Sequence, residues 1–291
     1  RAALRYVTQK PWSRIPAVTR TALLNPVLVC LAGGRNKMLA AKAYEFFNGE
    51  HFETGLRLHT PETIRDVSKE EVPMWIAKLG GFGVVKVPYS NAGQGVFTIT
   101  SKEELAAFME GDFPYDRFIV QSLIGNSRWS SRGDSGHLFH VGTVPDKRGN
   151  IYVADLRFMV GASPDGFYPL AIYARRARSP LVADLDSASS SWDMLGTNLS
   201  TKTDAGGWVS ESERLLLMDN RDFNRLGIAL DDLIEGYMQS VMSVSAIDTM
   251  ASSLLTQRGK FRRRFFNTVN PDDALTNELM VSAPARGGPE S

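Results

Sequence analysis

The stretch that decides the fold reads Val84-Val85-Lys86-Val87-Pro88-Tyr89-Ser90-Asn91-Ala92-Gly93-Gln94-Gly95-Val96. An apolar strand delivers a lysine into a small glycine-containing loop, and the β-branched and aromatic run Val96–Thr100 follows as a second strand. Glycines let backbone N–H groups approach phosphate oxygens without a Cβ in the way, while Lys86 adds a charge and Ser90 and Asn91 add donors. The pattern therefore predicts a hairpin that covers a polyphosphate.

Two better-known phosphate loops do not fit this stretch. A Walker loop needs Gly-Lys-Ser/Thr at the start of a helix, and a dinucleotide fingerprint also opens a helix, whereas Val96–Thr100 consists of strand-forming residues. The remaining alternative is an ordinary hairpin in which Asn and Gly serve the turn geometry and the lysine is merely solvated. The stretch alone leaves both interpretations open.

Length and composition indicate an ordinary globular chain. Its 291 residues, 43% of them apolar, suffice for one large domain or two modest lobes. A formal net charge of +1 gives no reason to expect nucleic acid, a membrane surface or a polyacidic partner. Cys30 is the sole cysteine, which excludes an intrachain disulfide and a cysteine-built zinc site, and we expect a cytoplasmic protein. The longest apolar run, Pro26–Ala32, is too short to span a bilayer.

The sequence starts at Arg1 instead of methionine. We therefore expect a preceding domain that is missing or is supplied as a separate protein.

Local patterns predict the elements of the first half. A helix is expected over Asn36–Phe47, capped by Asn36 and carrying apolar residues on one face. Further helices are expected at Lys69–Leu79 and Ser101–Met109. Phe118–Ile124 has the composition of a buried strand.

The second half has the pattern of an antiparallel sheet followed by a mixed C-terminal part. Strands separated by Gly, Asp and Pro turns are expected at His137–Val144, Ile151–Val160 and Phe167–Tyr173. Ala183–Ser212 has no sustained period and is expected to form a long surface loop. A helix and two strands are then expected at Asn224–Ser245, Ile247-Asp248 and Phe261–Val269.

Several motifs, in the same order, resemble those of the ATP-grasp superfamily over most of the chain. The lysine strand and glycine loop are similar to its flap, and Phe118–Ile124 is similar to its adenine hinge. Three further motifs are similar to those of ribosomal-protein glutamate ligases and lysine-biosynthesis ligases: Ala154-Asp155-Leu156-Arg157-Phe158-Met159-Val160-Gly161, Ala171-Ile172-Tyr173-Ala174-Arg175-Arg176 and Thr197-Asn198-Leu199. The resemblance implies an α+β ATP-grasp fold with two lobes around an ATP cleft and a largely antiparallel C-terminal sheet.

The resemblance also implies a reaction and its residues. A carboxylate would attack the γ-phosphorus of ATP, and an amine would then displace phosphate from the acyl phosphate, which leaves ADP, phosphate and an amide. The substrates would be ATP, a small-molecule or peptide carboxylate and an amine. Such chemistry needs positive groups around the transferring phosphoryl and exclusion of water. The residues implied for ATP binding are Lys37, Lys86, Ser90, Asn91, Gly93, Gly95, Gln121, Ser122 and Leu123, and those implied for catalysis are Arg157, Arg175 and Asn198.

The alternation of side chains along a strand limits which of the arginines can line the site. Asp155 and Arg157 share one face of a strand, so they could equally form a solvent-exposed ion pair without a catalytic role. Arg175 and Arg176 point to opposite faces, so only one of them is expected to line the site, and we choose Arg175. The assignment of Asn198 depends on the resemblance alone, because asparagine in a loop is ordinarily a turn residue.

Magnesium is the second cofactor that the resemblance implies, with Asp248 and Asn270 as its ligands. In the family, a strand aspartate and a later Glu-x-Asn hold the metal, whereas here Thr268 stands at the glutamate position. Mg²⁺ prefers hard oxygen ligands with negative charge, and a threonine hydroxyl is a poor substitute. The alternatives for the missing ligand are Asp272, Asp273 and Asn267.

The expected organisation follows the same resemblance. Residues 1–36 would form a lead-in, 37–118 the small lobe with the flap, 119–280 the hinge and the larger lobe, and 281–291 a disordered tail. The expected function is an ADP-forming carboxylate–amine ligase. Two alternatives stay open: an ATP-binding regulatory or assembly module without turnover, which Thr268 favours, and an ATP-grasp kinase with a stable phosphorylated product.

Overall fold

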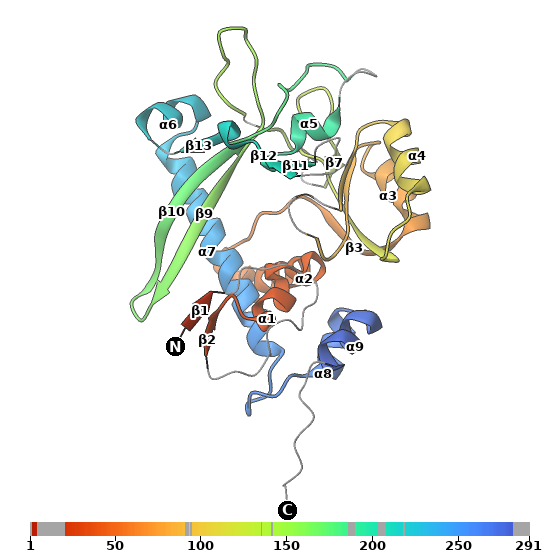
Figure 1. Ribbon diagram of the computed structural model, residues 1–291, viewed down its shortest axis with the longest axis vertical. Coiled ribbons are helices and arrows are strands. Elements are labelled where there is room, and N and C mark those ends of the chain that lie inside the picture. Colours follow the sequence, from red (N-terminus) through yellow and green to blue (C-terminus); the bar gives the residue numbers. More distant parts are fainter. Residues whose placement is uncertain are drawn as a thin grey trace, which may run out of the picture. The chain divides into compact units, whose positions relative to one another are not determined.

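The computed structural model describes residues 2–4, 21–90, 93, 95–134, 136–140, 142–185, 190–202, 208–217 and 219–281 (Figure 1). The chain forms two compact units: unit 1 contains Arg1–Leu58, Pro88–Asn91 and Ser243–Ser291, and unit 2 contains His59–Val87 and Ala92–Met242. The strand that contains the expected boundary between the lobes pairs within unit 2, and the division into lobes stays a prediction. The flap residue Asn91 and residues 282–291 of the expected tail lie outside the described residues.

Unit 1 is built around helix α2 (Lys37–Glu50), which follows a short parallel pair of strands, β1 (Ala2–Leu4) and β2 (Ala22–Leu24), then α1 (Val27–Val29) and a π-helical turn over Cys30–Gly34. Asn36 caps α2 as predicted, since its side-chain oxygen accepts from the Leu39 N–H at 3.2 Å. The helix continues past Phe47 because Asn48 does not cap it: its side chain instead bonds the backbone of Leu58.

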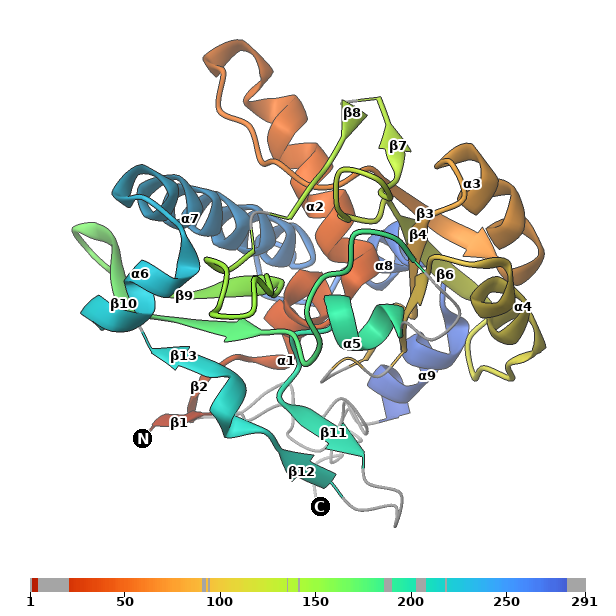
Figure 2. The same ribbon diagram turned by 90° about the horizontal axis from the view of Figure 1, so that it is seen from above.

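The first half of unit 2 is an antiparallel four-stranded sheet in the order β3-β6-β4-β5. Its strands are β3 (Thr63–Ser68), β4 (Gly83–Lys86), β5 (Val96–Ile99) and β6 (Arg117–Gln121). Helices α3 (Val72–Lys78) and α4 (Lys102–Glu110) pack on one face, where Val85, Phe108 and Phe118 belong to the buried core. Figures 1 and 2 show both helices beside this sheet. The pairing of β4 with β5, the burial of β6 and the Ser101 cap of α4 confirm the predicted hairpin, buried strand and capped helix.

A second antiparallel sheet, in the order β13-β10-β9, forms the other part of unit 2. Its long hairpin consists of β9 (Ala154–Ser163) and β10 (Gly166–Arg176), close to the predicted strands, and β13 (Leu215–Leu217) adds a short third strand. The helices and antiparallel sheets of the described residues confirm the α+β class.

The strand predicted at His137–Val144 is mostly wrong. Among the described residues of this stretch, His137 alone belongs to a strand, β8 (Gly136–His137), which pairs with β7 (Arg132–Gly133). Gly142 adopts a positive φ of 58°, a left-handed conformation that ends extended structure.

The surface loop predicted over Ala183–Ser212 also contains regular structure. It holds helix α5 (Ser191–Leu195) and the strand pair β11 (Ser200–Lys202) and β12 (Trp208–Ser210). Ser190 caps α5, and Met194 is buried against Leu123 and Trp129. Long-range burial of this kind has no local periodicity, which explains why the composition alone gave the wrong prediction.

The C-terminal strand predictions are wrong, because this region is helical. The predicted helix divides at Gly227 into α6 (Asn220–Leu226) and α7 (Leu230–Ser253), and α7 includes the residues expected as the strand Ile247-Asp248. Most of the strand expected at Phe261–Val269 is α8 (Arg263–Val269), which precedes α9 (Asp273–Val281). Helical spacing decides both cases, since α7 buries Ala246 and Met250 and α8 buries Phe266 and Val269.

Within the described part of the chain, no helix combines the length and apolar character that crossing a membrane requires.

Candidate functional site

The glycine hairpin of unit 2 has the geometry that the sequence predicted. Lys86 at the end of β4 pairs with Val96 at the start of β5, and the Val87 N–H donates to the Gly95 carbonyl at 2.8 Å. Gly93 and Gly95 have φ of 77° and 67°, in the left-handed region that disfavours side chains. The turn therefore depends on glycine at both positions.

Lys86 lies on the sheet face opposite α3 and α4, because its neighbour Val85 points into their core. Its ammonium donates to the Gln121 amide oxygen at 2.5 Å, and the Gln121 amide nitrogen donates to Thr63 at 2.8 Å, which fixes the orientation of the amide. Burial lowers the pKa of Lys86 to about 8, because desolvation disfavours its charged form. Among the described residues, no carboxylate pairs with Lys86, so this cation has capacity for an anionic ligand.

Asp155 joins the two catalytic arginines predicted on the β9–β10 hairpin. Arg175 binds it through two hydrogen bonds, at 3.0 and 2.6 Å, and Arg157 lies within 2.9 Å of the same carboxylate. Burial opposes ionisation of Asp155, but the hydrogen bond from Arg175 and the charges of both arginines outweigh it and lower its pKa. Arg175 also donates to the Thr197 hydroxyl at 3.1 Å. Two arginines and one carboxylate leave a net positive cluster.

The loop after α5 brings this cluster to the glycine hairpin. A Cβ added to Gly93 would lie 2.0 Å from the Asn198 amide nitrogen and 2.8 Å from the Trp192 ring. Asn198 is therefore packed against the turn, and Thr197 beside it contacts Arg175. Of the predicted residues in unit 2, these contacts link Gly93, Asn198, Arg175 and Arg157.

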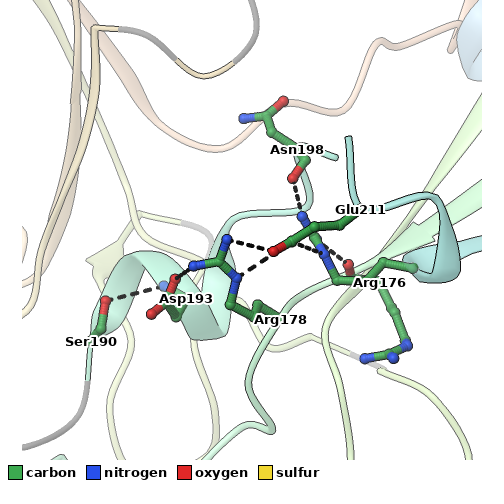
Figure 3. A network of polar contacts seen from close by, with 7 residues as sticks. Arg176, Arg178, Ser190, Asp193, Asn198 and Glu211 are labelled. Carbon is green, nitrogen blue, oxygen red and sulfur yellow. Dashed lines mark hydrogen bonds and ion pairs between the residues drawn. The ribbon is translucent and has the colours of Figure 1, made fainter. Parts of the chain in front are cut away.

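A polar network fixes the backbone of this loop (Figure 3). The buried Arg214 donates to the carbonyls of Asn198 and Arg176, the latter at 2.7 Å, and pairs with Glu211 at 2.7 Å. Arg178 bridges Glu211 and Asp193, a residue in the middle of α5. Arg214 was not predicted, because nothing local distinguishes a buried arginine from an exposed one. Arg178 was not predicted either, because its partners Asp193 and Glu211 lie many residues away.

A second contact anchors α5 at its start. The hydroxyl of Ser191, a buried residue, lies 2.5 Å from the Thr98 hydroxyl and bonds the Glu104 carboxylate. Because Thr98 belongs to β5 and Glu104 to α4, this contact fixes Trp192 and its loop to the hairpin sheet. Ser191 was also missed, since serine at a helix start usually serves only as a cap.

Two of the residues predicted to bind ATP, Lys37 and Ser90, contact each other in unit 1. Lys37, in the first turn of α2, donates to the Ser90 hydroxyl at 2.6 Å and to the Ser90 carbonyl at 3.2 Å. The Lys37 N–H also donates to the Pro88 carbonyl at 3.0 Å.

The backbone N–H groups of the predicted adenine-hinge residues Ser122 and Leu123 already donate hydrogen bonds within the protein. The Ser122 N–H donates to the Glu62 carbonyl at 2.9 Å, and the Leu123 N–H donates to the Ser131 hydroxyl at 2.7 Å. The buried Ser122 hydroxyl has no partner within the described structure. These two amides would have to exchange partners to bind a purine, so the adenine-hinge assignment stays a prediction.

The predicted magnesium ligands do not fit a metal ion. Asn270 is buried, its amide oxygen accepts from Asn36 at 2.9 Å and its amide nitrogen donates to Tyr89 at 2.8 Å. Asp248 is an exposed residue of a helix instead of a strand. Over the residues that the structure describes, no three His, Cys, Asp or Glu side chains cluster as a metal site would require. We therefore assign no metal to this pair.

Comparison with known proteins finds similarity among solved structures only. No protein-family model matches the chain, and no curated protein matches it. Among solved structures, the chain is similar to the crystal structure of a RimK domain protein ATP-grasp from Sphaerobacter thermophilus DSM 20745, at 16% sequence identity and a TM-score of 0.39, over 86% of this chain and 80% of that chain. That protein belongs by name to the superfamily that the sequence motifs resemble, but a similarity this low carries no assignment of function.

Proposed function

We propose that the protein is an ATP-dependent carboxylate–amine ligase that activates its acid as an acyl phosphate. The observation that carries the proposal is the contact between the glycine turn and Asn198, since it links a lysine hairpin suited to phosphate with an arginine cluster suited to an acyl phosphate. The order of the sequence motifs supports the same chemistry.

Each group has a role that follows from its contacts. Lys86 would neutralise phosphate charge, because its described partner is the uncharged Gln121, and Gly93 and Gly95 allow close backbone approach. Arg175 is oriented by Asp155 and Thr197, so its guanidinium is held in place before a substrate binds. Such preorganised cations stabilise charge that develops on a transferring phosphoryl group.

The proposed reaction has two steps. A carboxylate oxygen of the acid bonds to the γ-phosphorus of ATP, the bond from that phosphorus to the bridging oxygen breaks, and ADP leaves. The amine then attacks the acyl carbon, loses a proton, and releases phosphate with one former carboxylate oxygen. This oxygen transfer distinguishes an acyl-phosphate route from direct hydrolysis of ATP.

A second candidate is an ATP-binding regulatory or assembly module without turnover. The observation that favours it is that the side-chain amide of Asn270 is already bonded to Asn36 and Tyr89. Asn270 and Asp248 therefore do not form the magnesium site that turnover would need. Such a module would bind ATP at the same hairpin but form no ADP.

The test is a turnover assay with a panel of ¹⁸O-labelled carboxylic acids, ATP, Mg²⁺ and a mixture of amines. We expect ADP release that depends on the acid, with one ¹⁸O atom in the phosphate produced. The Arg175→Ala variant should lose both the ADP release and the labelled phosphate. ATP binding without ADP for every acid would support the module instead. ADP with a stable phosphorylated product would contradict the ligase and indicate a kinase.

A further inference from the structure

A separate pocket lies on the other face of the β10 strand. It has a volume of about 550 Å³ and is lined by Lys147, Arg176 and Arg225, with Tyr152 and Asp146 among the other lining residues. Arg175 and Arg176 are consecutive in β10 and point to opposite faces, so this pocket does not share the Arg175 cluster. Figure 3 shows the Arg176 side chain extending away from Asn198 and Glu211. The volume is within the range of small-ligand sites.

The pocket has an excess of positive charge. Arg176 stacks on the Tyr152 ring, with its guanidinium carbon 4.8 Å from the ring centre, and its other described contact is the Ala177 carbonyl at 3.3 Å. Lys147 is exposed and has no described acidic partner, and Arg225 forms only an exposed 3.4 Å pair with Asp222. Three cations therefore converge with little internal compensation.

The acidic lining residue is already engaged. Asp146 accepts from the Arg148 and Asn150 N–H groups at 2.8 and 2.9 Å and from the Asn150 amide at 3.2 Å. Those contacts shape the turn that carries Lys147, so this carboxylate organises the loop and is not free to bind the arginines.

The walls of the pocket are held by backbone hydrogen bonds. The Thr143 N–H donates to the Tyr152 carbonyl at 2.8 Å, and the Val144 N–H donates to the Arg225 carbonyl at 2.8 Å. The Tyr152 N–H in turn donates to the Thr143 side-chain hydroxyl at 3.0 Å. On the opposite side, Arg214 fixes the Arg176 carbonyl. The cations are thus presented by a connected scaffold.

We infer that this pocket binds a small anion with two or more negative charges, such as a phosphorylated or polycarboxylate molecule, at a site distinct from the proposed ATP site. The planar guanidinium of Arg176 suits a bidentate contact with an oxyanion, and Lys147 and Arg225 supply further charge. The inference does not depend on the proposed ligase activity.

The experiment is a calorimetric titration of the full chain with pyrophosphate and, separately, with citrate, at fixed ionic strength. We expect saturable binding of at least one anion, weakened about tenfold in Arg176→Gln and in Lys147→Gln. Arg148→Gln is the matched control, because Arg148 lies in the same turn but does not line the pocket. Lys147 is exposed, so its variant keeps the test valid if Arg176→Gln unfolds.

The outcomes separate the alternatives. Preference for pyrophosphate or for citrate identifies the ligand as phosphorylated or polycarboxylate, and either supports the site if Arg148→Gln binds normally. Equal losses in Arg148→Gln would show diffuse surface attraction and overturn the inference. Pyrophosphate binding that disappears in Lys86→Ala but persists in Arg176→Gln would overturn it too, because the anion would then occupy the glycine hairpin. No saturable binding of either anion would also refute it.

Discussion

The sequence predicts that Lys86 lies in a strand, but the burial that lowers its pKa is visible only in the fold. Its ammonium is partly desolvated, and its described partner is an uncharged amide. Such a group gains more from an anionic ligand than a solvated lysine does, because the ligand repays the cost of desolvation.

We expect ATP affinity to fall as pH rises above about 8, the pKa of Lys86 in the free protein. Bound phosphate favours the charged lysine and raises this pKa, so binding takes up a proton where the free lysine is neutral. Calorimetric titrations between about pH 7 and pH 9.5 measure the effect. Lys86→Arg should keep affinity and lose this dependence, since arginine stays protonated throughout. An identical pH profile in that variant would show that another group titrates.

Asp155 is expected to stabilise the fold in a pH-dependent way. Because its folded-state pKa is lowered, its contribution is present above the unfolded pKa and is lost as pH falls through the lower folded value. Asp155→Asn should reduce the free energy of unfolding by about 1–3 kcal/mol at neutral pH, and by less below about pH 3.5.

Urea unfolding at both pH values measures the Asp155 contribution. Asp165→Asn, in the exposed turn of the same hairpin, is the control and should change little. A loss of stability in Asp155→Asn that is equal at both pH values would contradict the role of the ionised carboxylate.

At the scale of elements, the glycine turn and the loop after α5 act as one assembly. Helix α5 is fixed at its start by Ser191 and at its middle by the contact of Arg178 with Asp193. This arrangement holds Asn198 against the turn that we propose for phosphate.

Gly93→Ala tests that arrangement. Alanine at this position would be strained by the φ of 77°, and its Cβ would overlap the side chains of Asn198 and Trp192. Gly149→Ala is the control, because Gly149 has a φ of 79° and nothing within 4 Å of an added Cβ. We expect both variants to lose about 1 kcal/mol of stability from backbone strain, and only Gly93→Ala to lose about tenfold or more in ATP affinity. Thermal unfolding and calorimetry measure the two effects, and equal ATP affinities would refute the contact.

The accuracy of the predicted elements follows from where their stabilising contacts lie. Asn36 and Ser101 cap their helices through contacts three residues away, so the local pattern was sufficient. The residues around Asp248 and Thr268 have β-branched and aromatic neighbours that favour strands, yet burial at helical spacing decides their structure.

For the whole molecule, the sequence predicted the α+β class that the structure shows, and the site residues stay a prediction. The hairpin lysine, the arginines and Asn198 were proposed from motifs, and all belong to unit 2, where described contacts connect Gly93 with the arginine cluster. Arg214 and Ser191 were not identified, because their roles arise from partners many residues away. The predicted metal pair failed for the same reason, since the contacts of Asn270 with Asn36 and Tyr89 are invisible in the sequence.

The most direct test is calorimetric titration of ATP into the full chain and two variants, Lys86→Ala and Lys102→Ala. Lys102 is an exposed lysine at the start of α4 and serves as the matched control. We predict measurable ATP binding by the unaltered protein and by Lys102→Ala, and an affinity at least about tenfold lower in Lys86→Ala, which loses a charged contact to phosphate. Absence of binding by the unaltered chain, or equal affinities in the two variants, would contradict a nucleotide site at the glycine hairpin.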